Sequence, residues 1–475
     1  MSSTSALNSL LSSSSSAADS IDLSEILEAA TGASTPGIDV TAAVNAAVTA
    51  AEAPEDVWES QETTVSSQDS ALTQIQTDAT TLSNDAEALN SLSGALSSTT
   101  VTSSNSSVAT ATSSGAATGT NVVVVTSLAT TASYSSSAVA SATTDLPAGT
   151  ITITPSSGTA TTITTGSGVD TLTDLENAIN SAGAGVTASI VTDATGSRLA
   201  IVSNTSGSAG SFTISSSGTG FGFTAGDTGA NASLTVNGIA ISSASNTVTG
   251  AIPGVTLNLL SASPGTQVSL TVAPDTTNAS TAINQFVTDY NTLVGALNTQ
   301  FADTDGSGQG VLAQDPTVQT FQSALLGMLD YTSTTGSGSS ATVTSLASLG
   351  ISVNTDGTLT VDSGTLNDAL QNNYSDVQNF FQGSALNGFA NSVDQMLTSF
   401  VNPTDGAFTV DLQSMTTEYS GLQTDITNFQ NNVITPLKAQ LQTEYSNAEI
   451  ALQQLPGEIK DVDAELGLDT SSSSS

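Results

Sequence analysis

The sequence predicts an α+β protein in which heptad helices from the N- and C-terminal segments form a discontinuous stalk, with β-rich, sandwich-like domains inserted between them. Three observations predict this class. One heptad stripe of apolar residues begins near residue 58 and a second near residue 412. Between them lie short β-like runs separated by Gly, Ser, Pro and Asn. Because a single helix cannot bury a heptad seam, we expect the two stripes to pack against each other.

The composition excludes most kinds of chemistry. The chain has 475 residues, a net charge of -39, only 3 Lys plus Arg, and neither Cys nor His. It therefore has no disulfide, thiolate nucleophile, Ser-His-Asp triad or imidazole metal ligand. So acidic a chain repels phosphate backbones, and we expect no nucleic-acid partner. The acidic residues are scattered and no aromatic-rich cleft accompanies them, so we predict a protein that is not an enzyme, with no catalytic, metal-binding or cofactor-binding residues.

The length predicts about three domains, at about 150 residues each. No run of apolar residues is long enough for a membrane span. Residues 1–37 are rich in Ser and Ala and predict a disordered tail, without the positive and apolar regions of a secretory signal. We therefore expect no classical signal-peptide secretion, and export by a route that reads no such signal stays open.

Residues 38–100 are predicted to form the N-terminal helical stalk. Apolar residues alternate at spacings of three and four along this segment, the pattern of a helix that pairs along a seam. Pro54, just ahead of the stripe, is interpreted as its start signal. The predicted seam residues are Trp58, Val65, Leu72, Ile75, Leu82 and Leu89.

The middle of the chain is predicted to be β-rich. Residues 101–119 are small and polar and are interpreted as a linker. Residues 120–230 are predicted to form an outer β-rich domain with one helix at 171–181, and residues 231–275 an inner β-rich domain. Their strand-like runs are rich in Val, Ile and Thr and are punctuated at short intervals by turn residues.

Residues 276–402 are predicted to be a helical and mixed segment of the stalk, with a hairpin at 349–361 that turns at an Asp-Gly pair. A loop in this segment, Asp303-Thr-Asp305-Gly, resembles the opening of an EF-hand calcium loop. Its twelfth position is Gln314, where the site needs a bidentate Glu, so we expect a solvated turn and no calcium site.

Residues 403–456 are predicted to form C-terminal heptad helices, followed by a tail over 457–475. Pro436 is expected to break or kink them, and Pro456-Gly457 to end them. The predicted seam residues are Leu412, Met415, Tyr419, Leu422, Ile426 and Phe429.

Several stretches resemble flagellar filament cap proteins, a family also called hook-associated protein type 2. Residues 37–60 resemble the family's entry motif, in which Gly-hydrophobic-Asp precedes an apolar helix and an acidic-Pro pair. Residues 233–273 resemble its most recognisable core, V-N-G-I, S-N-T-V and I-P-G-V-T-L, which 286–294 continue. The positions that carry the resemblance are Gly37, Ile38, Asp39, Val236, Asn237, Gly238, Ile239, Pro253, Gly254, Phe286, Tyr290 and Asn291.

This resemblance implies a function. Similar proteins leave the cell unfolded through the flagellum's own export channel and form a ring at the extracellular tip of the filament. There they promote the folding and polymerisation of flagellin without catalysis. The implied partners are further copies of the chain, flagellin and the hook-associated junction proteins, and no cofactor is implied.

Two alternatives remain open. One is an acidic, Ser/Thr-rich bacterial surface adhesin, for which a fixed repeat period is expected and none is found. The other is a different flagellar axial protein, either a junction protein or a flagellin-like protein, since these also carry terminal helices.

Overall fold

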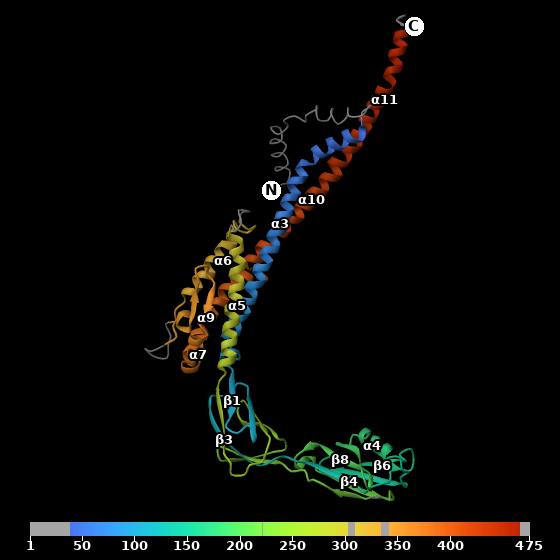
Figure 1. Ribbon diagram of the computed structural model, residues 1–475, viewed down its shortest axis with the longest axis vertical. Helices are drawn as coiled ribbons and strands as arrows, with labels where there is room; N and C mark the ends of the chain where they lie inside the picture. Colours follow the sequence, from blue (N-terminus) through green and yellow to red (C-terminus); the bar gives the residue numbers. More distant parts are fainter. Residues whose placement is uncertain (1–38, 221, 303–308, 334–341, 466–475) are drawn as a thin grey trace.

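The computed structural model describes residues 39–220, 222–302, 309–333 and 342–465. The predictions for the tail over 1–37, for Gly37 and Ile38, and for the loop at Asp303 and Asp305 lie outside these residues. The described chain is a helical stalk with two β-rich domains inserted into it (Figure 1). The predicted α+β class, with helices from both ends of the chain, is confirmed.

The stalk runs along the long axis of the molecule, and the β-rich domains follow at one end of it (Figure 1). Helix α3 (Val40–Asn90) lies side by side with α10 (Ala407–Phe429) and the first part of α11 (Thr435–Glu465). The last part of α11 extends beyond the N-terminal end of α3. Segments from opposite ends of the chain therefore form one helical unit.

Helix α3 begins earlier than the sequence suggested. Asp39 caps it, and its Oδ1 accepts a hydrogen bond from the backbone N of Ala42 at 3.0 Å. Pro54 lies inside the helix, so its interpretation as a start signal is wrong. A proline in a helix loses one hydrogen bond and bends the axis, and the N-terminal part of α3 is bent in Figure 1. Packing against α10 and α11 supports the helix on both sides of this point.

The C-terminal helices also continue past their predicted breaks. Between α10 and α11 the chain forms one π-helical stretch, η5 (Gln430–Ile434). Pro436 lies directly after it, where the altered hydrogen-bond ladder accommodates a residue that has no N–H to donate. Pro456-Gly457 does not end the helix, because α11 continues to Glu465. The predicted tail over 457–475 is therefore helical in its first part.

Residues between the β-rich domains and α10 pack around the second half of α3. They include a hairpin, β16–β17, whose turn carries Gly357 at φ 82°, a conformation that glycine tolerates best. The expected hairpin at 349–361 is thus present. The elements are α5 (Thr276–Phe301), α6 (Pro316–Gly327), η3 (Met328–Asp330), η4 (Leu346–Leu349), β16 (Ile351–Val353), β17 (Leu359–Val361), α7 (Ser363–Asn372), α8 (Tyr374–Gln382) and α9 (Phe389–Val401).

The inner domain, next to the stalk, consists of two antiparallel sheets that enclose one apolar core. The five-stranded sheet has the order β1-β15-β3-β11-β12, and the three-stranded sheet has the order β13-β14-β2. The strands are β1 (Thr99–Ser103), β2 (Ala109–Ser113), β3 (Gly119–Ser127), β11 (Ala232–Val236), β12 (Ile239–Ser243), β13 (Thr247–Ile252), β14 (Val255–Leu259) and β15 (Val268–Pro274).

Two predicted boundaries are wrong in this domain. Residues 101–119 are not a linker, because β1 and β2 lie within or across them and pair with β15 and β14. The inner domain is also not confined to 231–275, since β3 forms the centre of its larger sheet. The short Ser/Thr-rich strands had been read as loop. Their backbone groups are paired by strands that are distant in sequence, which local composition does not reveal.

The outer domain contains a four-stranded sheet of order β10-β4-β8-β7 and a three-stranded sheet of order β6-β5-β9. Helix α4 (Leu172–Ser181) matches the expected helix at 171–181 and buries Leu172, Leu175 and Ile179 in the core of this domain. The strands are β4 (Thr131–Ser136), β5 (Gly149–Pro155), β6 (Thr161–Thr165), β7 (Val186–Asp193), β8 (Gly196–Ser206), β9 (Phe212–Ser217) and β10 (Phe223–Ala225), with η2 (Ser208–Gly210) between them.

Candidate functional site

In the part of the chain that the structure describes, no three Asp or Glu side chains gather closely enough to hold a metal ion. None of the helices described is long and apolar enough to cross a membrane. The features from which a function can be argued are therefore surfaces: the paired helices of the stalk, the turns that fix the inner domain, and the distribution of charge between the domains.

The N-terminal half of α3 pairs antiparallel with the C-terminal helices. Trp58 packs edge-on against Phe429, with ring centroids 5.4 Å apart. Amide side chains add cross-links on either side. Gln423 Nε2 donates to Glu62 Oε1 at 3.0 Å, and Gln430 Nε2 donates to Glu55, which is buried. These contacts place the two predicted heptad stripes in one seam over this half of the stalk.

The second half of α3 does not pair mainly with the C-terminal stripe, contrary to the prediction. Its seam residues enter a large core formed with α5, α6, α8 and α9, and only the start of α10 joins it. The reason is competition, because α5 and α9 carry broader apolar faces and bury these residues completely. Near this junction Gln76 Nε2 still donates to Thr409 Oγ1 of α10 at 3.0 Å.

The two sets of seam residues differ in burial. On α3 the fully or largely buried ones are Val65, Leu72, Ile75, Leu82 and Leu89. Trp58 and all six C-terminal ones are only half-buried, namely Leu412, Met415, Tyr419, Leu422, Ile426 and Phe429. Sequence reasoning did not anticipate this asymmetry. The C-terminal stripe therefore keeps part of its apolar surface exposed in a single chain.

The V-N-G-I sequence forms a tight hairpin turn between β11 and β12. Asn237 and Gly238 both have positive φ, 51° and 83°, as a type I′ turn requires. Asn237 also fastens this turn to β3, since its Oδ1 accepts from Val122 N at 2.9 Å and its Nδ2 donates to Asn121 Oδ1 at 2.9 Å. Val236 is buried and Ile239 is exposed. This motif fixes the register of β12.

Pro253 and Gly254 form the turn between β13 and β14. Gly254 has φ 73°, and a Cβ at this position would lie 2.7 Å from the backbone N of Ala116. The Gly254 carbonyl accepts from Ser114 N at 2.7 Å. Only glycine permits this close approach of two backbones, which joins the small sheet to the segment after β2.

Residues Phe286, Tyr290 and Asn291 lie on α5 and organise the core of the stalk. Asn291 clamps the β16–β17 hairpin, because its Nδ2 donates to Leu359 O at 2.8 Å and its Oδ1 accepts from Leu359 N at 2.6 Å. The Tyr290 hydroxyl donates to Gly357 O at 3.1 Å, and burial raises the pKa of Tyr290. Phe286 packs edge-on against Phe389. All three positions support the fold and contact no cavity suited to chemistry.

A pair of carboxyl groups links α3 to α5. Asp85 Oδ2 is buried and receives no hydrogen bond from any donor among the described residues, and the group interacts with Asp289. Burial, followed by the hydrogen bond and charge of Asp289, raises the pKa of Asp85 to about 7. The two carboxyl groups therefore share one proton below neutral pH, and two negative charges face each other above it.

This pair predicts a pH dependence of stability. Since the folded pKa of Asp85 lies above the unfolded value, the native state binds the extra proton between about pH 4 and 7. Stability from this group is present at low pH and lost as the pH rises through 7. Asp85→Asn should remove that loss and raise the melting temperature at pH 8 by about 2 °C, while changing little at pH 4, after allowance for partial exposure. Thermal melts followed by circular dichroism measure this difference.

Asp289→Asn is the reciprocal variant for this test. It removes the hydrogen bond and the charge that contribute to the raised pKa of Asp85, so the same loss of stability should move to lower pH. Parallel stability curves for the wild type and both variants between pH 4 and 8 would show that the pair does not titrate as described.

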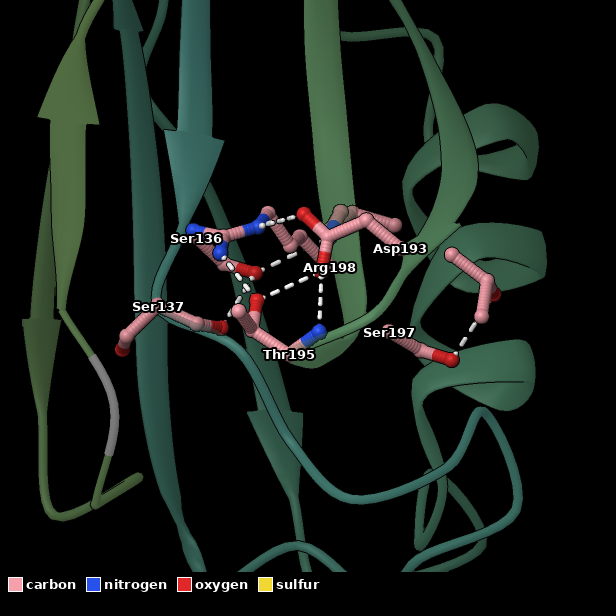
Figure 2. Close-up of polar contacts among 8 residues, drawn as sticks. Ser136, Ser137, Asp193, Thr195, Ser197 and Arg198 are labelled. Atoms are coloured by element: carbon pink, nitrogen blue, oxygen red, sulfur yellow. Dashed lines mark hydrogen bonds and ion pairs between the residues drawn. The ribbon is translucent and has the colours of Figure 1, made fainter.

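The only cation of the outer domain is used within one hairpin (Figure 2). Arg198 Nε lies 3.3 Å from Asp193 Oδ2, and Arg198 Nη2 donates to Thr195 Oγ1 at 2.7 Å. Hydrogen bonds from Thr195, and then the nearby guanidinium, hold the pKa of Asp193 below its usual range. The arginine is thus bound to the β7–β8 turn that carries it and is not held ready for an acidic partner.

Charge is distributed very unevenly along the chain. Residues 88–144 and 228–274 contain no Asp, Glu, Lys or Arg. These two segments supply every strand of the inner domain. The outer domain and the loops that join it carry only Asp145, Asp170, Asp174, Glu176, Asp193, Arg198 and Asp227. All other acidic residues lie in the stalk segments or nearer the ends of the chain. A count of charges by position, instead of a total, would have shown this from the sequence.

Comparison with protein families gives two long matches. Residues 36–132 match the model described as Flagellar hook-associated protein 2 N-terminus, and residues 229–456 match the model described as Flagellar hook-associated protein 2 C-terminus. Residues 150–205, in the outer domain, match the Flagellin hook IN motif. Together the first two matches cover most of the chain. No curated protein matches the chain as a whole sequence.

Comparison with solved structures gives flagellar cap proteins. The D1-D2-D3 domains of the flagellar cap protein FliD from Escherichia coli share 29% identity, with 73% of this chain and 99% of that chain covered and a TM-score of 0.56. FliD (HAP2) from Pseudomonas aeruginosa PAO1 shares 30% identity, with 42% of this chain and 98% of that chain covered and a TM-score of 0.37.

Proposed function

The chain belongs to the flagellar hook-associated protein 2 family, and from this premise we propose that it caps the flagellar filament as a ring of identical subunits. Filament capping is the function of this family of proteins. The ring, its contact with flagellin and the export route are the parts that we propose for this chain. Its place is the extracellular tip of the flagellum.

One observation carries the proposal. The match to the flagellar cap protein of Escherichia coli extends over 99% of that chain, which includes stalk and β-rich domains together. The same order of parts occurs here, with paired terminal helices, an inner domain and an outer domain. A match to a single β-rich domain would have supported only the fold of that domain.

The proposed action is mechanical and involves no covalent chemistry. The cap holds an incoming flagellin at the filament tip while it folds and inserts. The C-terminal helices keep apolar side chains at the surface, among them Val410, Val433 and Ile450. Such surface suits reversible contact with flagellin and with the hook-associated junction proteins.

The proposed export route runs unfolded through the flagellar channel. Two features of the chain suit it. Without Cys, no disulfide has to form or break during passage. A net charge of -39 also disfavours collapse and aggregation of the unfolded chain. Neither alternative, the adhesin or another flagellar axial protein, is favoured by a specific observation, since the flagellin motif match is confined to residues 150–205.

Deletion of the gene is expected to abolish long filaments. Without a cap, exported flagellin should not be retained at the tip, so monomers should accumulate in the medium. Electron microscopy of the cells and immunoblots of the culture supernatant measure both effects. Supply of the intact gene in trans should restore filaments, which controls for effects on neighbouring genes. Filaments of normal length in the deletion strain would exclude the capping function.

A further inference from the structure

We propose that the exposed edge of β12, in the uncharged inner domain, is the surface through which one copy of the chain binds the next. This inference depends on the ring described above, because it says where its subunits meet. The partner is the inner domain of a second copy. Two independent observations carry it, the distribution of charge and the condition of the sheet edges.

The first observation is electrostatic. Each copy carries a net charge of -39, so two copies repel each other over most of their surfaces. The inner domain is the exception, because its strands and their connecting loops contain no charged residue. At about 0.15 M salt, repulsion is screened beyond about 8 Å, so a contact made through an uncharged surface leaves the acidic stalk segments largely screened from each other. Charge alone therefore selects the inner domain for self-association.

The second observation is that one edge of the larger sheet is unprotected. Among the described strands, β12 pairs with β11 on one side only, with no shift of register. It has no charged residue, proline or bulge, the usual devices that keep edges from pairing with other chains. Ile239, at its start, is 70% exposed. Such an edge accepts a further strand.

The other edges of the inner domain are protected. Strand β1 is covered by β2, whose Ser113 hydroxyl donates to Thr99 O. Strand β13 is interrupted by a shift of register between Thr249 and Ile252, where Gly250 has φ 77°. A bulge of this kind bends a strand away from a straight partner. Within this domain the contrast leaves β12 as the edge available to another copy.

The hairpin fixes which backbone groups face outward. Val236 and Ile239 close the two-residue turn, so Ile239, Ile241 and Ser243 direct their N–H and C=O groups to β11. Ala240 and Ser242 therefore direct theirs away from the sheet. Both residues are exposed. A second copy would bond to these two residues.

The test uses the full chain and sedimentation velocity at 0.01 M and 0.5 M salt. Wild type should be mostly monomeric at low salt and oligomeric at high salt. Ala240→Pro removes an outward N–H without removing a bond to β11, and Ala240→Asp places a charge at the contact. Each should weaken self-association at high salt about tenfold. Melting temperatures should stay close to that of the wild type, since neither change touches the core.

The matched controls are Thr192→Pro and Thr192→Asp. Thr192 is exposed on β7, an edge of the outer domain, and its N–H also faces away from the neighbouring strand. These variants carry the same chemical changes and should assemble like the wild type. Ala240 variants that assemble normally would overturn the β12 contact and leave the ring intact. If they assemble normally but no longer bind flagellin, the edge serves flagellin, which also overturns it. A wild type that stays monomeric in all conditions would overturn the ring itself.

Discussion

Leu82→Asp is expected to lower the free energy of unfolding of the stalk by about 5 kcal/mol. Leu82 is 0% exposed and lies in the core that α3 shares with α5 and α9. The substitution removes a buried side chain and places a carboxyl group where the neighbouring side chains are apolar and offer no hydrogen bond. Both effects act on the same site, so a larger loss is expected than for a truncation to alanine.

Two signals follow this variant. Circular dichroism at the helix band reports the stalk, since nearly all helix lies there. The emission of Trp58, the only tryptophan, reports the seam with Phe429. Because Trp58 is half-buried, its red shift on unfolding should be modest. The β-rich domains have separate cores and are expected to melt on their own, so the stalk signals should be read apart from the total heat of unfolding.

Leu92→Asp provides the matched control. Leu92 is 72% exposed and follows α3 directly, so the same chemical change should alter the free energy of unfolding by less than about 0.5 kcal/mol. Equal melting curves for Leu82→Asp and wild type would show that α3 is not buried at this position.

The heptad stripes predicted the stalk because periodic apolar residues are a local signal. They could not predict which helix covers which part of α3. Leu72 and Leu89 continue the same stripe as Trp58, yet they pack against α5 and α9 and not against the C-terminal helices. That choice depends on the relative size of apolar faces that are brought together only by the fold.

Prolines and small polar residues misled the reading for a related reason. Pro54 and Pro456 are helix breakers by propensity, but each lies inside a long helix. The Ser/Thr-rich strands β1 and β2 have no local strand signal and exist because β15 and β14 pair with them. In each case contacts from a distant segment override a weak local preference.

The candidate site was predictable only in part. The turn residues Asn237 and Gly238 signal a hairpin from their sequence alone, and their positive φ angles agree. The edge that this hairpin leaves exposed could not be known before the order of strands was known. The absence of charge from the inner domain was visible in the sequence, but it had no meaning until those residues formed one domain.

Phe389→Ala is expected to lower the free energy of unfolding of the stalk by about 4 kcal/mol and its melting temperature by about 10 °C. Phe389 lies at the centre of an aromatic cluster. Its ring is stacked on Phe380 with centroids 5.4 Å apart, and it lies 5.7 Å from Tyr331. Phe286 and Phe381 lie 5.9 Å away, both edge-on. Truncation therefore leaves a cavity that four rings cannot easily close.

Two further variants give this prediction its controls. Phe389→Leu keeps most of the apolar volume and loses the ring contacts, so it should cost about 1 kcal/mol. Val353→Ala, at a position that is 51% exposed on the nearby hairpin, should cost less than about 0.5 kcal/mol. Chemical denaturation followed by circular dichroism ranks the three. If Phe389→Ala were no worse than Val353→Ala, the cluster would not hold α5, α8 and α9 together, and the stalk would need another source of stability at the point where the inner domain joins it.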